Sequence, residues 1–258
     1  MRWLCLVGLL ASCTGALRDR TWNRWPGTSD HQAAQSLIKH AIAAHGGMRA
    51  YDHGPILRVH LQDDWLGFAR LRRPWPSDSM ELVVDPKRSR LFMATSVEDL
   101  GAGMGWLWDG DRLFRMNGQS SKQLEEKPGL VFIMRALAYL LSLPFSLEGE
   151  SGISYLGKFS KSFGEYHWLQ MPETNLDPTW FLGIDPATGL IGSLVSPAPI
   201  LAGNDIQFEA IWSQPVEVAG MVIPSIRKVK ARDGEIAIHE VTLTNWRLAS
   251  AQEARLMD

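Results

Sequence analysis

The sequence predicts a mainly β (α+β) fold: a large, curled antiparallel sheet or unclosed barrel, covered by an N-terminal helix and a central apolar helix. Short segments of alternating apolar and polar residues recur along most of the chain, which is typical of half-buried strands. One helical pattern precedes them at residues 30–45, and a strongly apolar one interrupts them at residues 128–143. Because strands and helices do not alternate, we expect no parallel sheet of βαβ units. A sheet with this many strands must curl, split or close.

The composition narrows the class of protein. The chain has 258 residues, of which 45% are hydrophobic and 21% are charged, so it has enough apolar material for a sizeable core. Its formal net charge of -2 offers no basic surface for phosphates, and we expect no nucleic acid as a partner. The 11 tryptophans suit half-wet cavities and membrane interfaces, although a core that uses tryptophan explains them as well.

The N-terminus has the parts of a secretory signal peptide. Arg2 precedes the apolar run Trp3–Leu10, and small residues follow. The sequence Leu10-Ala11-Ser12-Cys13 resembles the lipobox of bacterial lipoproteins. This resemblance implies cleavage before Cys13 and lipid attachment at Cys13, which would anchor the protein in a membrane. The alternatives are a short uncleaved anchor or a cysteine that follows an apolar start by chance.

Cysteine usage and domain boundaries follow from this leader. Cys5 would leave with the signal peptide, so the mature chain would hold one cysteine and no internal disulfide. Thr14 follows the lipidated residue, and for a Gram-negative source the resemblance then implies the periplasmic side of the outer membrane. We expect a signal peptide at 1–12, a polar tether at 13–29 and a single β-domain at 30–258.

The first helix is expected from about Asp30 to His45. Ser29 or Asp30 can cap it, since a short side-chain oxygen accepts a hydrogen bond from a free N–H of the first turn. Gly46-Gly47 is expected to end it, because the position after a helix often needs a positive φ. Its apolar face recurs at helical spacing: Ala33, Leu37, Ile38, Ala41 and Ile42.

The strands are expected between turn signals. Asp109-Gly110 and Asn117-Gly118 are strong hairpin signals between apolar runs. The expected strands are 56–62, 67–72, 80–84, 90–95, 106–108, 113–116, 153–159, 166–171, 179–184, 190–195, 206–212, 221–226, 227–231 and 236–248.

The central helix at 128–143 is apolar on most faces and is therefore expected to be almost wholly buried. Pro128 suits its first turn, and the helix is too short to span a bilayer. Arg135 needs a partner or access to water in such surroundings. It could meet a lipid headgroup or a carboxylate, or it could form an ion pair or reach solvent at the rim.

The order of these elements resembles the LolA/LolB-like superfamily of lipoprotein carriers. The phrases that carry the resemblance are Ala41–Gly47 (AIAAHGG), Leu141–Leu147 (LSLPFSL), Leu182–Gly189 (LGIDPATG) and Val218–Pro224 (VAGMVIP). The resemblance implies an unclosed sheet covered by helices, with a hydrophobic cavity between sheet and helix that receives acyl chains. It assigns no specific binding residue.

Two functions fit these predictions. The first is a membrane-anchored lipoprotein that binds or carries a lipid or acylated ligand in the cell envelope. The second is a structural or interaction lipoprotein of an envelope complex, with a protein partner and no ligand. Candidate ligand-binding residues for the first are Phe132, Arg135, Leu137, Leu140, Leu141, Trp168, Trp180, Phe208 and Trp212.

Catalytic motifs are missing from the sequence. Gly101–Gly105 lacks the spacing of a dinucleotide loop, and neither G-x-S-x-G nor H-E-x-x-H occurs. Five histidines occur early in the chain, and they fit helix caps or surface positions better than a zinc site: His31, His40, His45, His53 and His60. An enzyme with an unrecognised site is a third hypothesis, and the missing motifs argue against it. We therefore expect no enzyme, no catalytic residue, no metal and no cofactor.

Overall fold

The computed structural model describes residues 30–124, 128–161, 164–172, 179–198, 203–231 and 237–257. The expected signal peptide, the tether and Cys13 lie outside these residues. Within them, a 13-stranded antiparallel sheet has the order β6-β5-β4-β3-β2-β1-β13-β12-β11-β10-β9-β8-β7. The sheet is not closed, and β6 and β7 form its two edges. The fold class predicted from the sequence is therefore confirmed.

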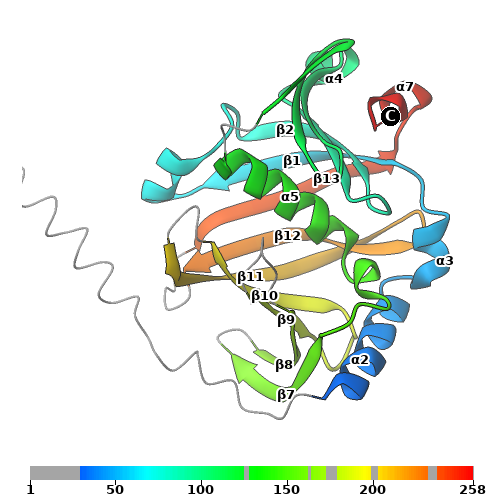
Figure 1. Cartoon of the computed structure of the whole chain (residues 1–258), viewed down its shortest axis with the longest axis vertical. Coiled ribbons are helices and arrows are strands. Elements are labelled where there is room, and N and C mark those ends of the chain that lie inside the picture. The colour runs from blue at the N-terminus through cyan, green and yellow to red at the C-terminus, as the bar shows by residue number, and fades with distance from the viewer. Residues whose placement is uncertain are drawn as a thin grey trace, which may run out of the picture.

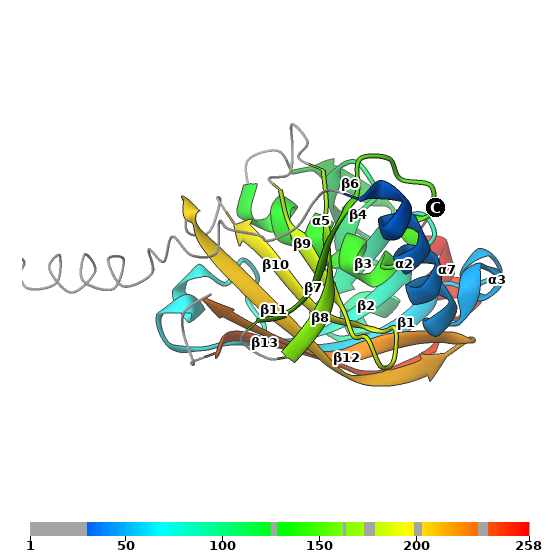
Figure 2. The ribbon, with the colours of Figure 1, turned by 90° about the horizontal axis from the view of Figure 1, so that it is seen from below.

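The strands form two meanders that meet in the middle of the sheet, where β1 pairs with β13. The sheet curls around the central helix α5, which crosses its concave face (Figures 1 and 2). The strands are β1 (Leu57–Trp65), β2 (Ser79–Asp85), β3 (Arg90–Ala94), β4 (Met104–Trp108), β5 (Leu113–Asn117), β6 (Ser120–Gln123), β7 (Ser154–Lys161), β8 (Gly164–Gln170), β9 (Phe181–Ile184), β10 (Ile191–Ala198), β11 (Gly203–Val218), β12 (Met221–Ala231) and β13 (Ala237–Leu248).

Both predicted helices are present. Asp30 caps α2 (His31–Ala44) by accepting a hydrogen bond from the Ala33 N–H at 2.9 Å, and α5 runs from Pro128 to Ser142. The other helices are short: α3 (Gly47–Asp52), α4 (Val97–Gly101), α7 (Ala251–Ala254) and the 3-10 helices η2 (Gly67–Arg72), η3 (Phe145–Leu147) and η4 (Arg255–Met257).

Two predictions about the elements were wrong. Residues 67–72 form the 3-10 helix η2 instead of a strand, because backbone bonds such as Ala69 N–H to Leu66 O close turns of three residues. Leu71 in this helix is 83% exposed, so the apparent alternation does not mark a core face. Residues 221–226 and 227–231, predicted as two strands, form the one strand β12.

The phrase His45-Gly46 anchors the end of α2 to the sheet. His45 is buried, its Nδ1 lies 2.6 Å from the Val222 carbonyl oxygen, and its Nε2 accepts the Ile191 N–H at 3.1 Å. Gly46 has a φ of 106°, and a Cβ there would lie 1.9 Å from the Gly220 carbonyl oxygen. No other residue type fits this close approach, so the phrase has a structural role.

Apolar side chains form three clusters. The largest fills the concave face beneath α5 and reaches α2. The second lies on the outer face of β2 and β3, where α4 and the C-terminal helices cover Val83 and Phe92. The third lies on the outer face of β7 to β10 and centres on Trp168. The concave cluster is therefore the one that α5 covers, and it positions the candidate site.

Candidate functional site

Helix α5 covers the concave face with apolar side chains, some of them buried and others half-buried. Its fully buried residues recur at helical spacing, whereas its remaining apolar side chains are half-buried. Burial is thus less complete than the sequence predicts. The helix packs most closely against β3, β4 and η3. The buried set is Leu130, Met134, Leu137, Ala138 and Leu141, and the half-buried set is Val131, Phe132, Ile133, Tyr139 and Leu140.

The structure brings most of the candidate ligand-binding residues to this face. Leu137, Leu141 and Trp212 are buried in the concave cluster. Leu140 and Trp180 are half-buried and pack against it, and Trp180 meets Tyr139 edge-to-face with ring centroids 5.7 Å apart.

Three further candidates are half-buried: Phe132, Arg135 and Phe208. Phe208 shares a face of β11 with Ala210 and Trp212 of the concave cluster, because alternate residues of a strand point the same way. Phe132 and Arg135 belong to the half-buried sides of α5.

Trp168 is separated from the other candidates. It is fully buried in the outer cluster with Tyr166, and its Nε1 donates to the Phe159 carbonyl oxygen at 3.1 Å. The next residue, Leu169, faces the concave cluster instead. The run Trp168-Leu169 is apolar on both faces of β8, so its alternation did not indicate which residue points inward.

Arg227 is a residue of this face that the sequence reasoning missed. In β12 it alternates with Met221, Ile223 and Val229, all of which belong to or pack against the concave cluster. The alternation was the available signal, but the prediction of separate strands divided it between Ile226 and Arg227. A single strand places the arginine on the apolar face.

The guanidinium of Arg227 lies in surroundings that do not suit a charge. The residue is 3% exposed, and its guanidinium carbon lies 4.8 Å from the centroid of the Trp212 ring. None of its three side-chain nitrogens has a hydrogen-bond partner in the described part of the chain. Burial lowers the pKa of Arg227 to about 10. The buried Nε1 of Trp212 and Oγ of Ser225 also lack hydrogen-bond partners there.

Asp63 lies on the same face but is already hydrogen-bonded. It is fully buried, and its Oδ2 accepts bonds from the indoles of Trp65 at 2.8 Å and Trp75 at 2.6 Å. His239 Nε2 contacts its Oδ1. These contacts tie the segment after β1 to the sheet. They also occupy both oxygens of the carboxylate.

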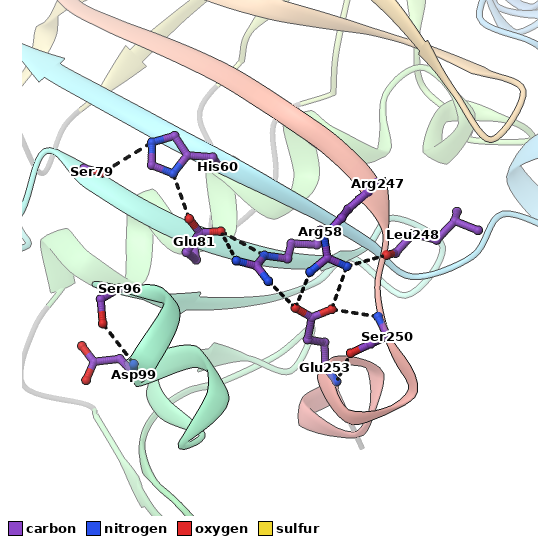
Figure 3. Close-up of polar contacts among 10 residues, drawn as sticks. All are labelled: Arg58, His60, Ser79, Glu81, Ser96, Asp99, Arg247, Leu248, Ser250 and Glu253. Atoms are coloured by element: carbon purple, nitrogen blue, oxygen red, sulfur yellow. Dashed lines mark hydrogen bonds and ion pairs between the residues drawn. The ribbon is translucent and has the colours of Figure 1, made fainter.

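A separate polar network lies at the outer side of β1 and β2 (Figure 3). Arg58 joins Glu81 at 2.9 Å to Glu253 at 2.6 Å, and Arg247 also reaches Glu253 at 2.8 Å. Burial raises the pKa of Glu253, but hydrogen bonds from Ser250, Arg247 and Arg58 outweigh it and lower that pKa to about 2. Ser250 and Glu253 form a capping box, so the network fixes α7 to the sheet.

Two surface pockets lie away from α5. A pocket of about 360 Å³ is lined by Asp64, Trp65, Leu66, Arg70, Arg73, Asp78 and Glu240. The other, of about 140 Å³, lies beside the network of Figure 3. Neither is lined by a candidate ligand-binding residue. Among the described residues, no cluster of three or more His, Cys, Asp or Glu could hold a metal ion. No helix in these residues is long and apolar enough to cross a membrane.

The class of fold is an open, curled antiparallel sheet with a helix across its concave face, and a known structure shares this arrangement. A LolA superfamily protein from Nitrosomonas europaea matches with a TM-score of 0.54 and 10% identity, over 84% of this chain and 94% of that one. The chain therefore has a LolA-like fold.

Two further structures match less well. A DUF1329 family protein from Desulfovibrio piger has a TM-score of 0.43 and 11% identity, over 87% of this chain and 95% of that one. The lipoprotein LppX from Mycobacterium tuberculosis has a TM-score of 0.30 and 10% identity, over 84% and 96%. No family model and no curated protein sequence matches the chain.

Proposed function

We propose that this protein is a membrane-anchored lipoprotein that binds or carries a lipid or an acylated ligand between the concave face and α5. One observation carries the proposal: in the described residues, helix α5 covers a continuous apolar face, and its half-buried side chains are mostly apolar as well, with Arg135 as the charged exception. The LolA-like fold supports it. No catalytic motif was found in the sequence, and we propose a binding role rather than an enzymatic one.

Binding would be passive. Each CH₂ group removed from water contributes about 0.8 kcal/mol, so an acyl chain of ordinary length binds well without chemistry. The contact of Tyr139 with Trp180 joins α5 to the second meander, whereas the closest packing of α5 is against β3 and β4. We therefore expect the acyl chain of the ligand to enter between α5 and the strands β9 to β11, next to Leu140 and Trp180.

The membrane anchor is the second part of the proposal. Cleavage before Cys13 and acylation of Cys13 would attach the domain through the 13–29 tether. Stable attachment to a membrane needs more than one acyl chain, and a bacterial lipoprotein carries several on its N-terminal cysteine. With Thr14 after the cysteine, the expected location in a Gram-negative cell is the periplasmic side of the outer membrane.

Mass spectrometry of the full-length protein extracted from membranes tests both parts. Under denaturing conditions, the expected mass is that of residues 13–258 plus acyl chains, and a mass that begins at Met1 without modification would refute the anchor. Under native conditions, we expect an additional bound lipid.

Ligand binding is tested by the uptake of a fluorescent fatty acid after delipidation. The variant Leu140→Glu, on a half-buried side of α5, should weaken uptake about 10-fold or more, since a charge in an acyl site opposes binding. The matched control Leu248→Glu, at an exposed position of β13, should bind normally. If neither the wild type nor the two variants take up the fatty acid, the proposal of a lipid carrier is refuted.

A structural lipoprotein of an envelope complex is the second candidate. One observation favours it: Leu130, Met134 and Leu141 of α5 are buried against the sheet, as the residues of a filled core are. In-cell crosslinking followed by extraction would then yield a stable, stoichiometric protein partner and no lipid. The carrier predicts a bound lipid instead.

A further inference from the structure

The guanidinium of Arg227 is the feature of the concave face that packing alone does not explain. A buried cation costs several kcal/mol unless hydrogen bonds and an opposite charge offset the loss of water. Arg227 is buried, yet none of its three side-chain nitrogens is hydrogen-bonded to a described residue. Its guanidinium stacks over the ring of Trp212, and this cation–π contact offsets only part of that cost.

The groups around Arg227 offer hydrogen-bond donors. Trp212 lies directly opposite it in the β11–β12 ladder, and its Nε1 is a donor with no partner among the described residues. Ser225 precedes it by two residues on the same face of β12, and its hydroxyl lacks a hydrogen bond there too. A cation flanked by an indole N–H and a hydroxyl is a combination that suits an anion.

The nearest acid on the same row of the sheet does not supply that anion. Arg227 pairs with Val241 of β13, and Val241 pairs with Asp63 of β1, so two strand spacings separate the acid from the arginine. Adjacent strands are about 4.8 Å apart, which places the two backbones about 10 Å apart. Both oxygens of Asp63 are also occupied by Trp65, Trp75 and His239.

We propose that Arg227, with Trp212 and Ser225, binds the anionic head of an amphiphile, a carboxylate or a phosphate, whose alkyl chain lies between the concave face and α5. The inference rests on the proposed function and names the class of ligand. A guanidinium presents its N–H groups as a planar fork that matches two oxygens of one anion. In low-dielectric surroundings this pairing favours an anion strongly over a neutral head of the same size.

Three single-chain probes with the same 16-carbon tail test the inference: palmitate, hexadecyl phosphate and hexadecanol. We would measure the Kd of each for delipidated full-length protein by calorimetry or by displacement of a fluorescent fatty acid. The wild type should bind at least one of the two anions about 10- to 100-fold more tightly than the alcohol, the range expected for hydrogen bonds to a charged group. The preferred anion distinguishes a fatty acid from a phosphate-bearing lipid.

The variant Arg227→Met should abolish that preference, because the anions lose far more affinity than hexadecanol, whose hydroxyl has no charge to pair with the guanidinium. Arg115→Met is the matched control, because Arg115 also stacks on a tryptophan, Trp106, at 4.4 Å but lies exposed near the β6 edge. The control should keep the preference. If Arg227→Met does not accumulate as folded protein, Arg227→Gln tests the same loss of charge.

The outcomes separate this inference from the proposed function. Equal binding of anions and alcohol by the wild type, or a preference retained in Arg227→Met, would overturn the role of Arg227 while the carrier stands. Binding of none of the three probes by the wild type would overturn both.

Discussion

Replacing Arg227 by methionine is expected to stabilise the protein when no ligand is bound. The substitution removes a buried cation whose nitrogens make no hydrogen bonds to the described residues. Methionine is unbranched and flexible, so it can follow the path of the arginine stem across Trp212 and keep most of the apolar contact. A side chain that lowers the stability of the ligand-free fold is what we expect of a group that serves binding.

The magnitude follows from two opposing terms. The effective penalty of a buried ion is several kcal/mol, and a desolvated cation–π contact such as that with Trp212 returns about 2 kcal/mol. Exchanging buried ionic groups for apolar ones of similar volume has typically been neutral or stabilising by about 1–4 kcal/mol. A gain of roughly 2 kcal/mol would raise Tm by about 4–8 °C in a domain of this size.

Urea unfolding of delipidated wild type and variant, followed by tryptophan fluorescence and circular dichroism, measures this gain. The control Arg115→Met, at an exposed site, should change the free energy of unfolding by less than about 0.5 kcal/mol. A clear loss of stability in Arg227→Met with an unchanged m-value would refute the reasoning, since it would mean that the guanidinium contributes favourably to the ligand-free fold.

Three more predictions test the framework of the fold. The pKa of Glu253 is about 2 in the folded protein against a usual value of 4.5. The carboxylate therefore contributes fully to the stability of the fold above about pH 4.5, and this contribution disappears toward pH 2. The variant Glu253→Gln should cost about 1–3 kcal/mol at pH 7 and flatten the acid side of a stability–pH curve measured by urea unfolding. Burial lowers the pKa of His45 below 6.5, so the unfolded chain binds the proton more readily and stability should fall as the pH drops through 6.5. An NMR titration in which the His45 ring protonates at 6.5 or above would contradict this. Gly46→Ala should cost more than about 2 kcal/mol by thermal melting, because the new Cβ meets the Gly220 oxygen at 1.9 Å. Gly47→Ala, also at positive φ but with open space around it, should cost clearly less.

Elements with strong local signals could be predicted from the sequence. The apolar run of α5 behind Pro128 indicates a covered helix, and Asp109-Gly110 joins β4 to β5 as a hairpin turn. Asn117-Gly118 also turns the chain, but the strand that follows, Ser120–Gln123, is polar and fully exposed at the edge of the sheet. An exposed edge strand needs no apolar alternation, so periodicity could not reveal it.

The residues of the concave face could be predicted less well, because their positions depend on which way each strand faces. Leu137, Leu141 and Trp212 were chosen as large apolar residues and lie in the concave cluster. Trp168 met the same criterion and lies in the outer cluster. Arg227 is hard to recognise from the sequence, because a charge is typical of a solvent-facing position whereas the tertiary fold buries this one.

The pairing of β1 with β13 joins two halves of the sheet, each of which is formed by one continuous segment of the chain. Residues 57–123 form one meander and residues 154–248 form the other, while α5 belongs to the segment that connects them. Within each meander every strand pairs with its neighbour in sequence, so the β1–β13 ladder is the one long-range closure of the described sheet. A chain cut just before α5 should therefore reassemble from its two pieces, and the ladder could serve as the interface of a split reporter for ligand occupancy beneath the helix.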